Sequence, residues 1–315
     1  MANDRTFYAC QAVAMSLQPS GGCAPMTTGY QFIKGVQSVG INSNFEFDQL
    51  YELGQIEVYD TVGKMPKIEV TIEKVLDEFI SPYTIMATGT TLMMDSKSYA
   101  TIQFALWSDL VNASGSTALK TVKCKDMVVN SVSYTFPLDG PCKESITLGG
   151  FAAEWGNSTF YAGAATPGAT GTGLPIGSGA GTVMLRKDVV ATLPQGSSKA
   201  QSITLSVDLG REDLMELGRY APYARVPNYP VEVTAEIEYL ANEVTAPTFT
   251  VTQDSTDLPI VDQTISVTAG KYTVALGNKC FCKSVTYGGG DAGGGNATVK
   301  YSYATYNTFN AHYTP

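Results

Sequence analysis

The chain has 315 residues, which is enough for two domains of about 150 residues that each bury a core of their own. Hydrophobic residues make up 44% and charged residues only 16%, which excludes a disordered chain, while 31 Gly, 18 Tyr and abundant Thr and Val favour an all-β fold with one or few short helices. The formal net charge of −9 argues against a protein that grips nucleic acid, because phosphate contacts require Lys and Arg.

Residues 1–30 are interpreted as an N-terminal arm, interrupted by Gly21-Gly22 and Pro25. The weakly apolar stretch 10–17 fits either an edge strand or an arm that docks on a neighbour. No basic cluster followed by an apolar run is present there, so we predict no signal peptide. No stretch approaches the ~20 apolar residues needed to span a bilayer. We therefore expect synthesis and folding in a cytoplasm, without a membrane partner.

The first domain is expected at residues 31–150. Apolar and polar residues alternate at 38–42 and at 67–73, which predicts two half-buried strands. The segment between them is too long for a tight turn and carries apolar residues, so we expect a long ordered loop that binds a partner. Ser81, Pro82 and Gly89 have the spacing of a cap, a first-turn proline and a stop signal for a short helix. Further strands are predicted at 99–107, 127–136 and 144–148.

Residues 151–200 form a connector that is rich in Gly, Ala, Thr and Pro, which indicates an extended excursion. The second domain is expected at residues 201–315. Its predicted strands lie at 202–209, 231–238, 264–268, 272–276, 280–287 and 298–303. The tyrosine-rich stretch from Tyr301 to Tyr313 is typical of a strand with an aromatic packing face.

An internal repeat links the two domains. Residues 37–66 recur 164 positions later as residues 201–230, and nine of the thirty positions are identical. Unrelated sequences would share about two. After one dropped residue, the strand 69–73 matches 232–236. We therefore predict two like domains in one chain, each able to occupy the same position in an assembly.

One face of the predicted strand pair is apolar in both copies, and the other is polar, with Lys67 as the main exception. The acidic residues on the polar side are Glu69, Glu73, Asp208, Glu232, Glu236 and Glu238. An ordinary solvated sheet face is one explanation. The other is a channel lining: subunits that join sheet edges close into a barrel with alternate residues inside, and an acidic lumen would let DNA slide without sticking.

The chain lacks the usual signatures of an enzyme or a metal site. Its single histidine, His312, lies in the C-terminal tail, and no P-loop, GxSxG or HExxH motif occurs. The six cysteines match no zinc pattern, so we expect mostly free thiols, with a disulfide or an adventitious metal left open. No catalytic, metal-binding or cofactor-binding residues are predicted.

Several motifs, taken in their order, resemble the tail tube proteins of long-tailed bacteriophages. The motifs are Gln37-Ser38-Val39 with Leu53-Gly54-Gln55 and Pro66, the strand 70–77, the strand–turn–strand 133–148, and the segment 206–234. Together they cover roughly two-thirds of the chain. The resemblance implies a β-sandwich with one helix, whose subunits form rings with their inner sheets joined into a barrel. Stacked rings would form a tube that conducts the genome during ejection.

The resemblance also implies how the chain assembles. Tube domains of that family normally ring in sixes, so two copies per chain predict three chains per ring, with six chains and an outer second copy as the fallback. Implied partners are the chain itself, the tape measure, tail terminator and baseplate or tip proteins, a sheath where the tail contracts, and DNA in transit. The expected location is the virion tail, assembled in the host bacterial cytoplasm. Contacts with neighbouring subunits or rings are expected from Leu50, Tyr51, Leu53, Tyr59, Leu214, Met215, Leu217, Tyr220 and Tyr223.

Two other functions fit the same residues. One is another virion component, such as a capsid decoration or minor tail protein, which would not polymerise into tubes. The other is a carbohydrate-binding or adhesive β-protein that uses its tyrosines.

Overall fold

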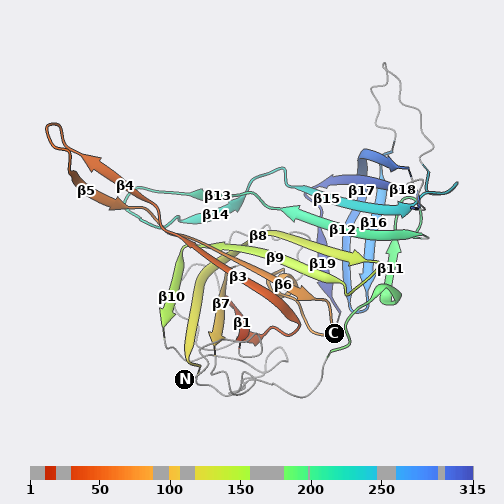
Figure 1. Ribbon diagram of the computed structural model, residues 1–315, viewed down its shortest axis with the longest axis horizontal. Helices are drawn as coiled ribbons and strands as arrows, with labels where there is room; N and C mark the ends of the chain where they lie inside the picture. Colours follow the sequence, from red (N-terminus) through yellow and green to blue (C-terminus); the bar gives the residue numbers. More distant parts are fainter. Residues whose placement is uncertain are drawn as a thin grey trace.

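The computed structural model describes residues 11–18, 30–87, 99–106, 118–156, 181–197, 199–246, 260–289 and 295–314. Among these residues, β-strands make up almost all of the regular structure (Figure 1). One short α-helix, α1 (Pro82–Met86), and one turn of 3-10 helix, η2 (Arg186–Asp188), accompany them. The predicted all-β class with one or few short helices is therefore confirmed.

Eight antiparallel strands form one continuous sheet, here called the central sheet, in the order β3-β6-β9-β8-β12-β15-β18-β17. The first copy contributes β3 (Val36–Asn44), β6 (Lys67–Val75), β9 (Lys143–Gly150) and β8 (Lys120–Pro137). The second copy contributes β12 (Ala200–Asp208), β15 (Glu232–Leu240), β18 (Thr298–Tyr306) and β17 (Tyr272–Gly288). Each copy thus supplies four strands in the same order, and β8 pairs with β12 where the copies meet.

Two smaller sheets, here called the flanking sheets, are built on the N-terminal halves of the long strands β8 and β17. The first has the order β2-β1-β7-β8-β10, with β2 (Gln31–Phe32), β1 (Gln11–Gln18), β7 (Tyr99–Leu106) and β10 (Ala152–Gly156). The second has the order β11-β16-β17-β19, with β11 (Val189–Thr192), β16 (Gln263–Ala269) and β19 (Asn310–Tyr313).

The flanking sheets explain three features of the sequence. The N-terminal arm supplies β1, whose side chains from Ala12 to Ser16 are buried, and the connector supplies β11. The strands expected separately at 272–276 and 280–287 are one strand, β17, which runs through both sheets. The aromatic packing face expected near the C-terminus is confirmed, because Tyr301 and Tyr303 are buried and stack at 5.9 Å between ring centroids.

The strand registers of the two copies coincide, with one correction to the sequence alignment. Glu73 lies opposite Ser38 on β3, and Glu238 lies opposite Ser202 on β12. Because Ser38 and Ser202 are equivalent, Glu73 corresponds to Glu238 and not to Glu236. The sequence alignment that matched 69–73 to 232–236 was wrong here. It followed the Glu-Val-Thr motif that occurs in both strands, whereas the residues in equivalent hydrogen-bonding positions are less similar in sequence.

A shared backbone irregularity supports this equivalence. The β3–β6 register shifts between Val36 and Ser38, and the β12–β15 register shifts at the matching point. In each copy the bulged residue is a glutamine whose side-chain amide donates to the carbonyl two residues earlier, from Gln37 to Gly35 and from Gln201 to Lys199. Gly35 and Lys199 both have positive φ, at 75° and 66°. Bulges of this kind are specific structural features, so the copies share a fold in detail.

Helix α1 belongs to the first copy and packs against the second. Ser81 caps it as predicted, since its Oγ accepts from Thr84 N, while Gly89 lies outside the described residues. Tyr83 of the helix meets Phe309 of the second copy edge-on, with ring centroids 5.6 Å apart, and Tyr134 packs on both rings. All three side chains are buried. The two copies therefore share one continuous core.

Charged side chains are also buried near α1. Lys74 Nζ lies 2.5 Å from Asp77 Oδ1, and the carboxylate of Glu144 accepts from the backbone N–H of Tyr83. Burial lowers the pKa of Lys74, although the nearby Asp77 charge opposes the shift. Burial likewise raises the pKa of Glu144. Buried charges of this kind require partners on every side, so they hold α1 and the adjacent chain in one arrangement.

The two segments expected to be long loops are β-hairpins that extend from one side of the molecule (Figure 1). The first pairs β4 (Phe47–Tyr51) with β5 (Val58–Gly63), and the second pairs β13 (Arg211–Leu214) with β14 (Ala224–Pro227). Their registers match, since Leu50 lies opposite Asp60 and the equivalent Leu214 lies opposite Ala224. We refer to them as the first and second hairpins.

Cys124, Cys142, Cys280 and Cys282 are buried free thiols, and Cys10 and Cys23 lie outside the described residues. No helix in the described ranges is long and apolar enough to cross a membrane. The described residues also contain no group of three or more His, Cys, Asp or Glu side chains that could hold a metal ion.

Candidate functional site: the polar face and the two hairpins

Polar side chains of both copies form rows across the central sheet. Directly opposed residues of an antiparallel sheet point to the same face. One row crosses six strands and contains Ser38, Glu73, Ser145, Ser133, Ser206 and Thr234. A second row contains Thr135, Thr204, Glu236, Ser302 and Ser284. We call this surface the polar face; the alternate apolar residues of the same strands belong to the core.

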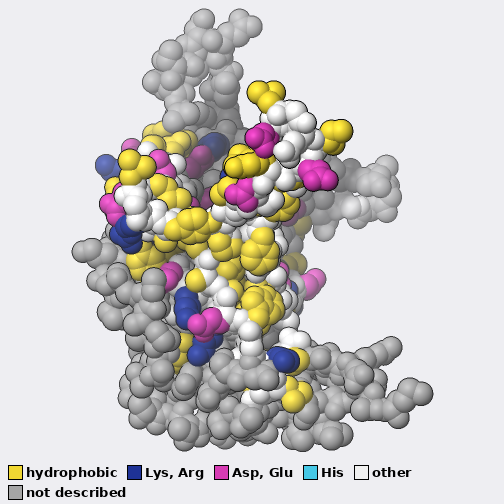
Figure 2. Space-filling view, turned by 90° about the vertical axis from the view of Figure 1, so that its left-hand side faces the viewer, with side chains coloured by type: hydrophobic (Ala, Val, Ile, Leu, Met, Phe, Trp, Pro, Cys, Tyr) yellow, Lys and Arg dark blue, Asp and Glu magenta, His cyan; other side chains and the backbone are white. Residues whose placement is uncertain are grey.

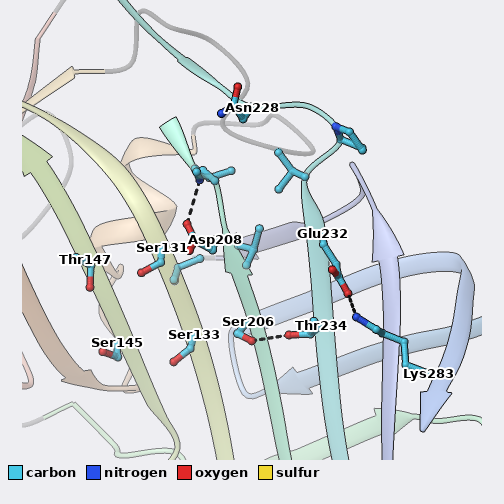
Figure 3. Close-up of a pocket in the computed structure, with 16 residues that line it drawn as sticks. Ser131, Ser133, Ser145, Thr147, Ser206, Asp208, Asn228, Glu232, Thr234 and Lys283 are labelled. Carbon is cyan, nitrogen blue, oxygen red and sulfur yellow. Dashed lines mark hydrogen bonds and ion pairs between the residues drawn. The ribbon is translucent and has the colours of Figure 1, made fainter. Parts of the chain in front are cut away.

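The polar face is hollowed where the two copies meet. A depression of about 600 Å³ lies over the β8–β12 junction and is lined by side chains of both copies (Figure 3). Within it, the hydroxyls of Ser206 and Thr234 are hydrogen bonded at 2.7 Å, and Lys283 Nζ lies 2.5 Å from Glu232 Oε1. The depression is open and has a mixed polar and apolar lining. It therefore has the form of a concave sheet surface and not of an enclosed ligand pocket.

All six predicted acidic residues lie on the polar face. Glu69 and Glu73 are on β6, Asp208 ends β12, and the other three are Glu232, Glu236 and Glu238 on β15. The carboxylate of Asp208 accepts from the backbone N–H of Gly210, and Ser202 Oγ donates to Glu238 Oε2 at 3.5 Å. The structure thus brings the set together on one surface, while its role as a channel lining stays a prediction.

Lysines on the same face reduce its negative charge. Lys67 is expected on this face from the sequence, and the structure adds Lys143, Lys283 and Lys300. Lys300 Nζ lies 2.9 Å from Glu236 Oε2, and Lys67 pairs with Glu46 at 3.0 Å. Six carboxylates and four ammonium groups leave a net charge of −2 on the face, so it is anionic but less so than expected. The position of Lys300 on the polar face could have been predicted, because it alternates along β18 with Ser302. Lys283 could not, because it sits at a bulge that breaks the alternation along β17.

The hairpins carry the predicted contact residues. Leu214 is half-buried, and the other eight candidates are exposed: Leu50, Tyr51, Leu53, Tyr59, Met215, Leu217, Tyr220 and Tyr223. The leucine at each hairpin tip is fully exposed, at 101% for Leu53 and 103% for Leu217. Each precedes a glycine with φ near +90°, so the two tips have the same turn. Hydrophobic side chains are prominent on this side of the molecule (Figure 2), which is typical of an interaction surface.

The second hairpin is anchored on the first copy by two arginines that are not among the residues predicted from the sequence. Arg211 Nε donates to Val129 O at 2.6 Å. Arg225 Nη1 donates to Gly149 O at 2.6 Å, its Nε lies 2.7 Å from Asp213 Oδ1, and its guanidinium lies over the Phe151 ring. These contacts fix the hairpin beside the β8–β12 junction. The first hairpin has threonine and phenylalanine at the equivalent positions.

No protein-family model and no curated protein matches this sequence. Among solved structures, the chain is similar to one from the "Cryo-EM structure of the anti-feeding prophage (AFP) baseplate, 6-fold symmetrised". The identity is 12% and the TM-score is 0.34, and the match covers 50% of this chain and 98% of the other.

Proposed function

We propose that this chain is a structural subunit of a phage-type tail tube. Chains would join edge to edge into rings, with the polar face toward the lumen, and rings would stack into a tube that conducts the genome to the host. The observation that carries the proposal is the β8–β12 pairing, which joins two equivalent four-stranded sheets into one eight-stranded sheet with a single concave polar face.

The central sheet favours three chains per ring. Both copies contribute to the same sheet, which argues against an arrangement with the second copy outside the ring. Three such sheets would give a barrel of about 24 strands. With strands ~4.8 Å apart and tilted by about 40°, opposite backbone walls would lie roughly 48 Å apart. Such a lumen is wide enough for polar side chains and a passing DNA duplex.

The chemistry of the polar face suits a conduit. Serine, threonine and asparagine side chains present hydroxyl and amide groups that water can hydrate, and the net charge of −2 repels phosphates without a strong field. Among the described residues, four of the six carboxylates make no ion pair and would contribute most of the repulsion: Glu69, Glu73, Asp208 and Glu238. DNA could then slide through without specific contacts.

Electron microscopy of the purified chain tests the proposal directly. We expect hollow tubes whose end views show threefold or pseudo-sixfold symmetry. A monodisperse monomer under all assembly conditions would contradict a tube subunit and favour a decoration or minor tail protein. Binding of that monomer to a glycan array would instead favour the carbohydrate-binding alternative.

A charge-reversal pair tests the orientation of the polar face. E69K/E73K removes two negative charges and adds two positive ones, which shifts the net charge of that face by +4 per chain, and D139K/E243K makes the same change at exposed positions outside the central sheet. We expect tubes of the first variant to retain short duplex DNA in sedimentation at low salt, and to protect it from nuclease. Wild-type tubes should retain none. DNA held by the control variant should remain nuclease-sensitive; equal protection by both variants would refute a lumenal polar face.

The remaining partners follow from the same proposal. A tube of this kind would contact a tape measure protein in its lumen, terminator and baseplate or tip proteins at its ends, and a sheath where the tail contracts. Its location would be the virion tail, after assembly in the bacterial cytoplasm.

A further inference from the structure

We propose that the seam between chains repeats the β8–β12 junction, so that β17 of one chain pairs antiparallel with β3 of the next, with Thr286 opposite Asn42. This inference rests on the proposed ring assembly and specifies its contact surface. The partner is a second copy of this chain, and the first hairpin of that copy covers the outer end of the seam.

Both strands have an open edge in the described structure. β3 pairs only with β6 there, and residues 283–288 of β17 pair only with β18, while the N–H of Cys282 donates to Ile260 O at 3.0 Å. β3 has nine residues and no charged side chain, and many of its residues are exposed. A long uncharged edge strand readily adds another strand, and soluble proteins normally protect such an edge. The two edges therefore form a natural pair of contact surfaces.

The junction inside the chain supplies the register. Ser133 on β8 lies opposite Ser206 on β12. The bulge between Val129 and Ser131 corresponds to the bulge between Cys282 and Ser284, so Ser133 is equivalent to Thr286. Ser206 is equivalent to Asn42 by the sequence repeat. Transfer of the pairing to the free edges therefore places Thr286 opposite Asn42.

Neighbouring pairs in this register match in polarity. Ser284 would lie opposite Asn44 on the polar face, as Ser131 lies opposite Asp208 inside the chain. On the apolar side, Tyr287 would cover Ile41, as Tyr134 covers Leu205. Tyr287 is 62% exposed in the single chain, so pairing would bury a large aromatic side chain. A slip of one residue would place polar side chains against apolar ones and is disfavoured.

The first hairpin has a matching target on the next chain. By the repeat, Phe47 and Thr61 stand where Arg211 and Arg225 stand on the second hairpin, and Tyr306 stands where Phe151, which Arg225 contacts, stands on the first copy. Phe47 is 58% exposed, and Tyr306, which stacks on Phe281, is 45% exposed. At the seam, Phe47 and Thr61 would thus replace the arginine anchors of the internal junction, and the hairpin would bury apolar surface of Phe47 and Tyr306 that both chains leave exposed.

Disulfide trapping tests the register. Opposed residues in an antiparallel pair lie 4.5–5.5 Å apart at Cα, within the usual range for a disulfide, whereas diagonal neighbours lie at about 7–8 Å. We expect N42C/T286C to form covalent dimers and trimers under mild oxidation of assembled tubes. The matched control N42C/S284C, which represents a two-residue slip, and the single variants should remain monomeric on non-reducing gels. Efficient cross-linking of the control instead would overturn the register.

Hydrogen exchange of the wild-type chain gives an independent measurement. Backbone amides within residues 36–44 and 283–288 that point to the open edges should become protected when chains assemble. Tubes that form without this protection would overturn the seam while leaving the tube function intact. A chain that forms no tubes would contradict the proposed function itself. If the cysteine variants fail to assemble when reduced, the exchange measurement alone decides the inference.

Discussion

Replacement of Phe309 by alanine would test whether the two copies depend on a shared core. Phe309 is fully buried and comes from the second copy, but its ring packs on Tyr83 and Tyr134 of the first. A buried Phe-to-Ala change costs about 3–5 kcal/mol of unfolding free energy. The two aromatic contacts account for about 0.5–1.5 kcal/mol each within that range. We therefore expect F309A to lose roughly 4 kcal/mol.

The assay is chemical denaturation of unassembled chain, followed by circular dichroism at low protein concentration. At about 2–4 °C per kcal/mol, the same loss should lower the melting temperature by roughly 10 °C. The control is F281A: Phe281 is half-buried and stacks on Tyr306 within the second copy, so its loss should be clearly smaller. Equal losses in both variants, or a loss below about 1 kcal/mol in F309A, would refute a shared core built around Phe309.

Three further changes probe other parts of the structure. Because burial raises the pKa of Glu144, the wild type should lose stability relative to E144Q as the pH rises from acidic to neutral. Urea unfolding midpoints of both proteins at several pH values measure this difference, and the same pH dependence in both would contradict the prediction. R225M removes the donor to Gly149 O, so limited proteolysis should cleave the second hairpin faster, and an unchanged rate would count against the anchor. Burial raises the pKa of Cys124 to about 12 and of Cys280 to about 11, so peptide mapping after native alkylation should find both unmodified; rapid labelling would argue against their burial.

Much of the central sheet could be predicted from sequence because its strands have one buried face and one polar face. Ile203 and Leu205 alternate with polar residues because they point to the buried face, and the strand β12 lies where the sequence predicts it. The first hairpin has no such signal. All residues of β4 and β5 are exposed, so no period-two contrast exists, and its sequence predicts a loop.

Features that depend on backbone irregularities were harder to predict. The correspondence of Glu73 with Glu238 is set by hydrogen-bonding register, which a short sequence motif does not report. Lys283 sits at a bulge, so its position on the polar face does not follow from alternation along β17. Arg211 and Arg225 contact the first copy across the junction, and the residues next to either arginine in the sequence do not indicate these contacts.

The covalent link between the copies changes the physics of association. Pairing of β8 with β12 takes place within one chain, where a linker holds the two strands at an effective concentration that can reach the millimolar range. A single-copy protein would have to form every such contact by collision. It would also leave two unprotected strand edges per module until it met a neighbour, whereas the fused chain leaves two edges for two modules. The covalent link thus halves the number of exposed strand edges per module in the single chain, which lowers the risk of unwanted edge-to-edge association.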